Sequence, residues 1–359
     1  MADTDATKGA GRTGPPPSPS TRHACRAPDL YDLSVLAYLL RRLAASIVIL
    51  VLASMLVFVL VANSGDPLAL LRLNPHTPEA VYAARRAALH LNDPLWQRYW
   101  IWFTGALHGN FGLTIGNQPV APQLWSHLLV TLEMVLIATA VAIVVGIGIG
   151  VLAAVRQGKP FDVGAAFTSY LFISTPVFVT GLVLKEFVAI PINNAVGHTV
   201  LYTLGQESPN LSGGFWQRLP DYAGHAVLPV LTLVLVTYPA WSIYQRSSML
   251  EALDSDYVRL ARAKGLHPRR VLIRHTLRNA LIPVTTVIAL DFAAVLGGAI
   301  VTENVYSWQG MGTWFYQGVT NLDFNTVQAY LLVTAFFVIA LNFVADVLYG
   351  ILDPRIRYG

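Results

Sequence analysis

The sequence predicts an all-α integral membrane protein with six transmembrane helices and both termini in the cytoplasm. Three observations predict this class. Of the 359 residues, 54% are hydrophobic and only 12% are charged. The apolar residues form long blocks, such as the uncharged segment "LAASIVILVLASMLVFVLVA" from Leu43 to Ala62. The basic residues gather on one side of the predicted membrane.

Each apolar block is long enough to cross a bilayer. A helix needs about 20 mostly apolar residues to span the hydrocarbon core, and it satisfies its own backbone hydrogen bonds there. The alternative, a soluble protein with buried helices, usually has apolar runs of about 10 to 14 residues. The six predicted spans are residues 43–62, 128–155, 163–184, 226–244, 281–302 and 326–352.

The distribution of charge predicts the orientation of the chain. In a soluble protein the formal net charge of +4 would suggest an anionic partner. With the N-terminus inside and six crossings, however, 18 of the 24 Lys and Arg residues lie on the cytoplasmic side. Cytoplasmic loops carry an excess of these residues, so both termini are predicted to be cytoplasmic.

The segment before the first span is predicted to be a disordered cytoplasmic tail, residues 1–35, because it is rich in Pro, Gly, Ser and Thr. It does not resemble a secretory signal, since the first apolar run begins after residue 40 and is too long. The single cysteine, Cys25, excludes an internal disulfide and a multi-cysteine metal site. Residues 36–359 are predicted to form one membrane domain.

Residues 63–127 are predicted to form a folded outer segment between the first two spans. The stretch "TPEAVYAARRAAL" from Thr77 predicts a helix with Pro78 at its first position. The stretch "NDPLWQRYWIWF" that follows is dense in aromatic residues, as is typical of a membrane interface, although a soluble aromatic cluster is the alternative. The other outer segments, 185–225 and 303–325, contain Pro and Gly and are expected to be irregular loops.

No enzyme signature is present in the sequence. "GIGIG" at 146–150 lies inside a span, so Gly146 and Gly150 predict close helix packing rather than a dinucleotide loop, which needs a preceding strand. The sequence has no Walker A, HExxH, GxSxG or paired-cysteine motif. We therefore predict no catalytic residue and no metal site, and we place any ATPase that drives transport on another chain.

A few residues inside or beside the spans are candidates for a pathway or a gate. Ionisable residues within a membrane are often functional, and Asp291 and Glu303 are expected either to pair with polar groups or to line a pathway. Pro176, Pro229 and Pro239 are expected to kink or open their helices. Such kinks can serve gating, but they are also common in ordinary membrane helices.

The only substantial inner connection is the basic loop, residues 251–282, and it is unusually rich in charge. Seven of the 24 basic residues fall between Arg259 and Arg278. The segment predicts a short helix that Asp254 or Ser255 can cap and that ends at Gly265, and a second helix that begins at Pro268. Nucleic acid is a poor partner for a loop held between two spans without stacking aromatics. A docking element for a cytoplasmic partner explains the pattern better.

Each of the two predicted helices has a distinct face. Residues of the first that are expected to share one face are Tyr257, Leu260, Ala261 and Lys264. An apolar stripe on the second consists of Ile273, Leu277, Leu281 and Val284, and a basic stripe consists of Arg270, Arg274 and Arg278.

Several segments together resemble a known family. "YVRLARAKGLHPRRVLIRHTLRNALIP" resembles the cytoplasmic loop of permease subunits in ATP-binding-cassette (ABC) importers of the peptide/nickel group. "YLLRRLAASIVILVLASMLVFVLVANSGDP", "LNDPLWQRYW", "HAVLPVLTLVL" and "ADVLYGILDPRIRYG" are similar to other parts of these permeases. The resemblance covers residues 36–359, and the long outer segment favours the first permease type of the dipeptide/oligopeptide systems.

The resemblance implies a fold, partners and a mechanism. The fold would be that of a type I ABC importer permease in the cell membrane of a prokaryote. The partners would be a second permease, two ATP-binding subunits that carry the ATP and Mg, and an extracytoplasmic substrate-binding protein, so that this chain needs no cofactor. Coupling residues of the loop would be Tyr257, Arg259, Ala261, Lys264, Gly265, Leu266, His267, Arg270, Arg274 and Arg278.

The sequence departs from the general family loop, EAA-x3-G. Counting back from Gly265 places Arg259, Leu260 and Ala261 at the EAA positions, so the glutamate is absent. A salt bridge that depends on that glutamate is therefore not expected. The substrate stays open, because similar permeases carry peptides, nickel, haem, glutathione or sugars. The alternative function is a proton-coupled secondary transporter that acts alone and uses Asp291 and Glu133.

Overall fold

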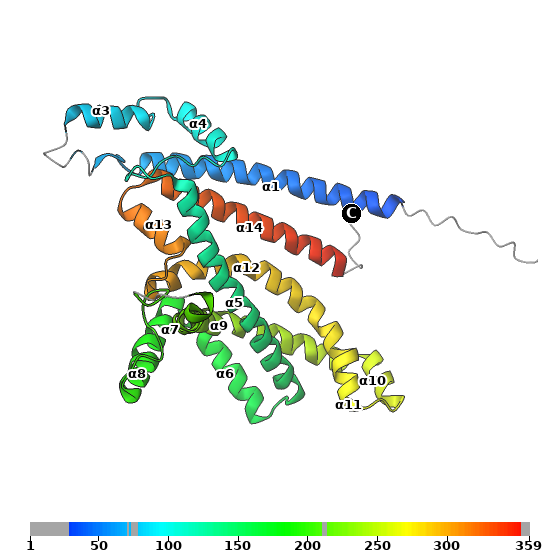
Figure 1. The fold of residues 1–359 in the computed structure, drawn as a ribbon. Helices are drawn as coiled ribbons and strands as arrows, with labels where there is room; N and C mark the ends of the chain where they lie inside the picture. Colours follow the sequence, from blue (N-terminus) through cyan, green and yellow to red (C-terminus); the bar gives the residue numbers. More distant parts are fainter. Residues whose placement is uncertain (1–28, 70–71, 73–77, 210–213, 353–359) are drawn as a thin grey trace, which may run out of the picture.

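The computed structural model describes residues 29–352 apart from 70–71, 73–77 and 210–213. The described part is helical and contains no β-strand, only an isolated bridge between Leu113 and Pro119. The helices of Figure 1 are, in order, α1 (Asp29–Asn63), α3 (Glu79–Ala88), α4 (Leu95–Leu107), α5 (Val120–Val155), α6 (Pro160–Ser174), α7 (Val177–Val183), the π-helix η1 (Leu184–Ala189), α8 (Ile190–Val196), α9 (Phe215–Leu253), α10 (Asp256–Ala263), α11 (Pro268–Arg270), the π-helix η2 (Val271–Leu277), α12 (Arg278–Tyr306), α13 (Met311–Thr320) and α14 (Phe324–Leu352).

The first helix starts earlier than the sequence predicts. α1 begins at Asp29, so the disorder predicted for residues 29–35 is wrong. This short segment contains neither Pro nor Gly, and adding a turn to an existing helix costs less than nucleating a new one. The first span therefore extends its helix towards the N-terminus. Residues 1–28, the rest of the predicted tail, and Thr77, the first residue of the predicted outer helix, lie outside the described residues.

The number of membrane-length helices agrees with the six predicted spans. Five helices are long and apolar enough to cross a membrane, and a bent pair makes a sixth. The two parts of the bent pair, residues 268–292 and 294–306, meet at 49°. The other five are Leu40–Asn63, Val120–Val155, Val177–Val196, Trp216–Leu253 and Phe324–Val344.

The third span differs from its predicted bounds of 163–184. The backbone at Thr175 is extended, with φ −94° and ψ 123°, so the helix ends before Pro176. Proline has no N–H and disfavours helical geometry at the residue before it. The helix that is long enough to cross a membrane is instead Val177–Val196, which α7, η1 and α8 form together. Pro176 thus breaks the helix rather than bending it.

The prolines of the fourth span behave differently. α9 continues as one helix through Pro220, Pro229 and Pro239. Of the two predicted effects of Pro229 and Pro239, a kink or an opening of the helix, the opening is absent in this conformation, since neither proline interrupts the helix. Neighbouring helices and Ser or Thr side chains can satisfy the backbone groups that a proline frees.

Figure 1 shows how the helices are arranged between two ends of the molecule. The start of α1, the end of α14 and the short helices α10 and α11 lie at one end, and α3, α8 and α13 lie at the other. α1 packs along α14 and also contacts α4, while α9 lies against α5, α12 and α6. The described ends of the chain are thus on the same side as the basic loop.

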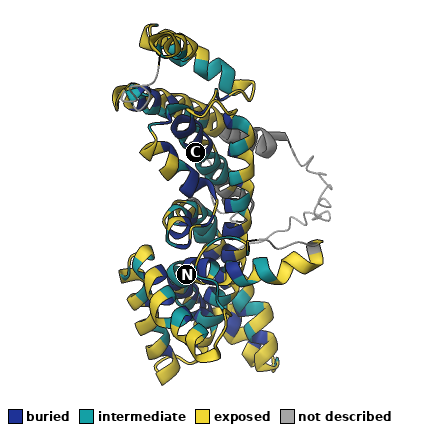
Figure 2. Cartoon of the chain, turned by 60° about the vertical axis from the view of Figure 1, so that its left-hand side comes forward, coloured by how far each residue is buried: buried dark blue, intermediate teal, exposed yellow. Residues whose placement is uncertain are grey.

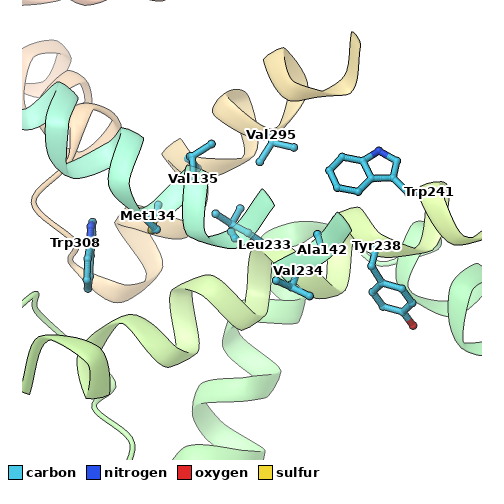
Figure 3. Close-up of a cluster of buried hydrophobic side chains, with 11 residues drawn as sticks. Met134, Val135, Ala142, Leu233, Val234, Tyr238, Trp241, Val295 and Trp308 are labelled. Carbon is cyan, nitrogen blue, oxygen red and sulfur yellow. The ribbon is translucent and has the colours of Figure 1, made fainter. Parts of the chain in front are cut away.

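The largest buried cluster lies where α5, α9 and α12 meet. Figure 3 shows Met134 and Val135 from α5 facing Leu233 and Val234 from α9, with Val295 from α12 beside them. All five side chains are buried. This contact joins the second, fourth and fifth spans into one unit.

The outer surface of the helices is largely apolar. Figure 2 shows exposed residues along the outside of the helices and buried residues between them. On α1, Leu52, Leu56 and Leu60 are each 61% exposed and repeat every fourth residue, which places them on one face. A continuous apolar face of this kind suits contact with lipid rather than with water.

Candidate functional site

The basic loop forms a compact helix–turn–helix unit at the C-terminal end of α9, the fourth span. α10 begins after Ser255, one of the two predicted capping residues, which has an extended conformation. The Ser255 hydroxyl does not cap α10; it donates to Ala252 O in the last turn of α9 at 2.5 Å. The side chain thus closes the turn between α9 and α10.

The exit from α10 is a glycine turn that satisfies the end of the helix. Gly265 has φ +73°, a left-handed conformation that glycine adopts without strain. Its N–H donates to Arg262 O at 2.9 Å, and the N–H of Leu266 donates to Ala261 O at 3.4 Å. This pair of bonds is a Schellman motif, which closes a helix around a left-handed residue. The predicted helix end at Gly265 is confirmed.

A small apolar cluster holds the two halves of the loop together. Val258, Ala261 and Val271 are buried against one another, and Leu266 packs on them. Ala261 therefore lies at the covered edge of the predicted face, and the other three residues of that face, Tyr257, Leu260 and Lys264, are exposed. Successive helical residues are about 100° apart, so the apolar pattern alone did not show which side would be covered.

The second half of the loop is wound more loosely than predicted. α11 leads into η2, where the Thr276 hydroxyl donates to Val271 O at 3.3 Å across five residues. This spacing changes the buried face, which consists of Val271, Thr276, Ala280 and Val284. The predicted apolar stripe is wrong at Ile273, which is 63% exposed. A π-helical turn takes one more residue than an α-helical turn, and the prediction assumed a regular helix.

The exposed surface of the loop carries both apolar and basic side chains. Tyr257 and Leu260 are 42% and 56% exposed, and the imidazole of His267 accepts from the Arg269 N–H at 3.4 Å as α11 begins. Basic residues surround these side chains. All seven basic residues of the loop are exposed: Arg259, Arg262, Lys264, Arg269, Arg270, Arg274 and Arg278.

A partly buried ion pair fixes the turn between α5 and α6, residues 156–162, to α9. Arg246 donates from Nε to Asp162 Oδ1 at 2.6 Å and from a terminal nitrogen to Oδ2 at 2.8 Å. The Gly158 N–H also donates to Oδ2, at 2.9 Å. The hydrogen bond from Arg246 is the main reason that the pKa of Asp162 lies below its ordinary value of 3.8.

The variant Asp162→Asn is expected to lower stability by about 2 kcal/mol at neutral pH, because it removes a charge-assisted bidentate contact. A carboxyl with a depressed folded-state pKa contributes stability above its ordinary pKa and loses it as pH falls through the folded value. The difference between the melting temperatures of wild type and variant should therefore be constant near neutral pH and shrink below about pH 4. A difference that stays constant in acid would contradict this role.

The crossing of α5 and α9 depends on two glycines of α5. A Cβ atom at Gly150 would lie 2.6 Å from Ser242 O and 2.7 Å from Gln245 Cβ, closer than atoms can approach. At Gly146 a Cβ would lie 3.1 Å from Tyr238 O. Only small residues at these positions let the two backbones come this close.

We expect Gly150→Leu to disrupt this crossing and to destabilise the chain by about 3 kcal/mol or more, because the neighbouring atoms include backbone that cannot move aside. Gly148→Leu is the matched control, since a Cβ at Gly148 meets nothing within 4 Å. Thermal melting of the two purified variants measures the difference. Equal melting temperatures would show that the glycine contact is not needed.

The acidic residue in the middle of the fifth span has a polar partner. Asp291 Oδ2 accepts a hydrogen bond from Trp241 Nε1 of α9 at 2.9 Å. The Trp241 ring is fully buried. Asp291 lies next to the 49° bend of its span, so this bond links the bend to α9. Of the two predicted alternatives, the geometry corresponds to structural pairing.

Glu303 is part of a hydrogen-bond network that the sequence does not reveal. The side chain is fully buried and accepts from Thr131 Oγ1 at 2.5 Å, Gly312 N at 2.6 Å and Thr313 N at 3.2 Å. Thr131 Oγ1 in turn accepts from Met311 N at 2.7 Å. Every neighbour donates, so the arrangement fits an ionised carboxylate at the N-terminus of α13.

This network explains a helix where the sequence predicts a loop. Gly310 and Gly312 suggest irregular structure, but α13 forms at Met311–Thr320. The carboxylate of Glu303 supplies the acceptor that the first N–H groups of a helix need. Thr131, which no motif in the sequence marks, contributes from a position 172 residues away. No local signal in the sequence could have linked them.

Comparison with known proteins places the chain in a family. Residues 146–358 match the family described as "Binding-protein-dependent transport system inner membrane component", and residues 35–136 match its N-terminal part. The oligopeptide transport system permease protein OppB of Mycobacterium bovis is 39% identical over 89% of this chain and 98% of its own. The dipeptide transport system permease protein DppB of Escherichia coli is 36% identical over 90% of this chain and 99% of its own.

A solved structure shows a weaker likeness. It is titled "Inward facing conformations of the MetNI methionine ABC transporter", and it has a TM-score of 0.48 and 16% identity over 64% of this chain and 96% of its own. The family match covers more than half of the sequence, from the α5 glycines through the basic loop to the C-terminus. The chain belongs to the family of binding-protein-dependent transport system inner membrane components.

Proposed function

We propose that this chain is one permease subunit of an ABC importer that carries peptides inward across the cell membrane. Family membership supports the transport role, and the peptide systems named for its relatives support the substrate class. The partners would be a second permease, two ATP-binding subunits and an extracytoplasmic binding protein. ATP and Mg would be bound by the partner subunits, and this chain would carry no catalytic residue.

The observation that carries the coupling role is the shape of the basic loop. α10 is closed at its C-terminal end by hydrogen bonds and held by a buried cluster, yet it exposes Tyr257 and Leu260. Exposed apolar residues on a rigid element are typical of a protein interface. An ATP-binding subunit that docks here would push directly on α9 and α12, which the loop joins.

In this mechanism, ATP-driven movement of the partner subunits would be transmitted through the loop to the spans. α9 packs against both α5 and α12, so a displacement at its inner end reaches the largest buried cluster. The break at Pro176 and the 49° bend of the fifth span are the places where the helices could change their angle. Alternating access would follow from these two breaks.

Purification of the tagged chain from its native membrane tests the proposal. We expect an ATP-binding protein and a second permease to copurify, and we expect the reconstituted complex to take up a labelled dipeptide or oligopeptide only with ATP. Uptake by the isolated chain under a pH gradient would instead support the proton-coupled alternative. If ATP-dependent uptake of nickel or haem replaces peptide uptake, the transport class stands and the substrate class is wrong.

A further inference from the structure

The outer segment contains a cavity that lies away from the basic loop. It has a volume of about 470 Å³ and lies between the outer end of α1, the helices α3 and α4, and the start of α14. Figure 1 shows α4 lying along α1, with α3 beyond it, at the end opposite the basic loop. The size falls within the range of about 300–1,000 Å³ that is usual for small-molecule sites.

The charged groups in this cavity are mainly basic. The Arg85 guanidinium donates to Asn117 Oδ1 at 2.7 Å and to two main-chain oxygens, all of them neutral. Arg98 lies over the Phe58 ring at 6.0 Å, and burial lowers its pKa although Asp93 partly offsets the effect. None of the ion pairs found among the described residues involves either arginine.

The remaining polar groups leave room for an anion. Asp323, the acidic residue in the lining, already accepts from Ile115 N at 3.0 Å and Thr326 N at 3.3 Å. Trp102 also lines the cavity, and its buried Nε1 donor has no hydrogen-bond partner among the described residues. Two arginines and an unused N–H donor together form a site for a phosphate or carboxylate oxygen.

The position of the cavity identifies the class of ligand. Phe58 lies in the membrane span Leu40–Asn63 and lines both this cavity and a groove formed entirely by apolar and aromatic residues of α1 and α4. In that groove Trp96 and Trp100 are largely exposed, as is typical of residues at the membrane interface. A basic cavity beside an apolar groove at this level matches an amphiphile with an anionic head.

We propose that the cavity binds the phosphate of an anionic phospholipid, with its acyl chains in the groove between α1 and α4. Arg98 provides the main charge contact, and Arg85 and Trp102 provide further donors. The lipid would fill the space between the outer end of the first span and α3 and α4. It would therefore stabilise the outer segment independently of which substrate the importer carries.

Native mass spectrometry of the full chain with its copurifying subunits tests this site. We expect phosphatidylglycerol to remain bound where phosphatidylcholine does not, and Arg98→Gln to weaken retention about tenfold, as loss of a charge-assisted hydrogen bond would. Arg98→Lys should retain part of the binding. Arg86→Gln is the control, because Arg86 is exposed on α3 and does not line the cavity.

Three outcomes would overturn the proposal. One is equal retention of phosphatidylglycerol by wild type and Arg98→Gln. Another is equal retention of phosphatidylcholine and phosphatidylglycerol by wild type. The third is release of bound phosphatidylglycerol by glycerol phosphate that is added at the same concentration as the lipid. This result would identify a site for small phosphate esters. If Arg98→Gln does not fold, the second and third outcomes, which need only the wild-type protein, still test the proposal.

Discussion

Replacing Gly265 with proline is expected to abolish uptake while the chain still inserts into the membrane. Proline fixes φ near −65°, whereas Gly265 has φ +73°, and proline also removes the N–H that donates to Arg262 O. The Schellman turn cannot form, and the rigid surface of α10 would be lost. ATP-dependent uptake by membrane vesicles, measured beside the amount of inserted protein, tests this expectation.

A matched control separates coupling from backbone strain. Gly197 also has a left-handed conformation, with φ +78°, and its N–H donates to Asn193 O at 2.9 Å at the end of α8. Neither glycine has an atom within 4 Å of an added Cβ. We expect Gly197→Pro to retain most of the uptake and Gly265→Ala to lose part of it, since alanine costs about 1–2 kcal/mol in this conformation. Normal uptake by Gly265→Pro would rule out the coupling role of the turn.

The second large effect is expected from Glu303→Gln. The carboxylate accepts three hydrogen bonds in a fully buried position. Glutamine has one acceptor oxygen, and its NH2 group would face at least one of these three donors. Leaving buried polar groups unpaired costs about 1–3 kcal/mol each, so we expect a loss of about 3 kcal/mol or more. Thermal melting and proteolysis of the segment around α13 report the loss.

Two variants define what the Glu303 network contributes. Thr131→Val removes one donor and the acceptor for Met311 N, and its effect should not add to that of Glu303→Gln, because the two residues form one network. Glu186→Gln is the control, since Glu186 is exposed on η1. Additive effects of the two network variants, or a melting temperature for Glu303→Gln equal to that of the control, would contradict the proposed capping of α13.

Local patterns predicted the features of this chain that depend on neighbouring residues. The apolar blocks identify six spans because a bilayer requires about 20 apolar residues in sequence. The glycine turn of the basic loop was equally readable, because a left-handed residue after a short helix favours glycine. Both features are decided within one or two helical turns, without reference to the rest of the chain.

Other features depended on contacts between distant segments. α6 ends before Pro176, whereas α9 continues through Pro229 and Pro239, and the local sequence did not distinguish these outcomes. The face of α10 was decided by Val271 and Leu266, which cover Ala261. For the prolines and for the face of α10, the local sequence allows more than one outcome. The packing of neighbouring helices selects among these outcomes.

The sequence by itself determined the class of the protein, the number of its spans, and the helix–turn–helix form of the basic loop. Hydropathy and backbone preference are properties of short segments, so they can be read without a structure. Only the tertiary structure revealed that Glu303 caps α13, that Asp162 pairs with Arg246, and that Arg85 and Arg98 line one outer cavity. Each of these joins segments far apart in the chain, and their energies depend on distance and burial that only the folded chain defines.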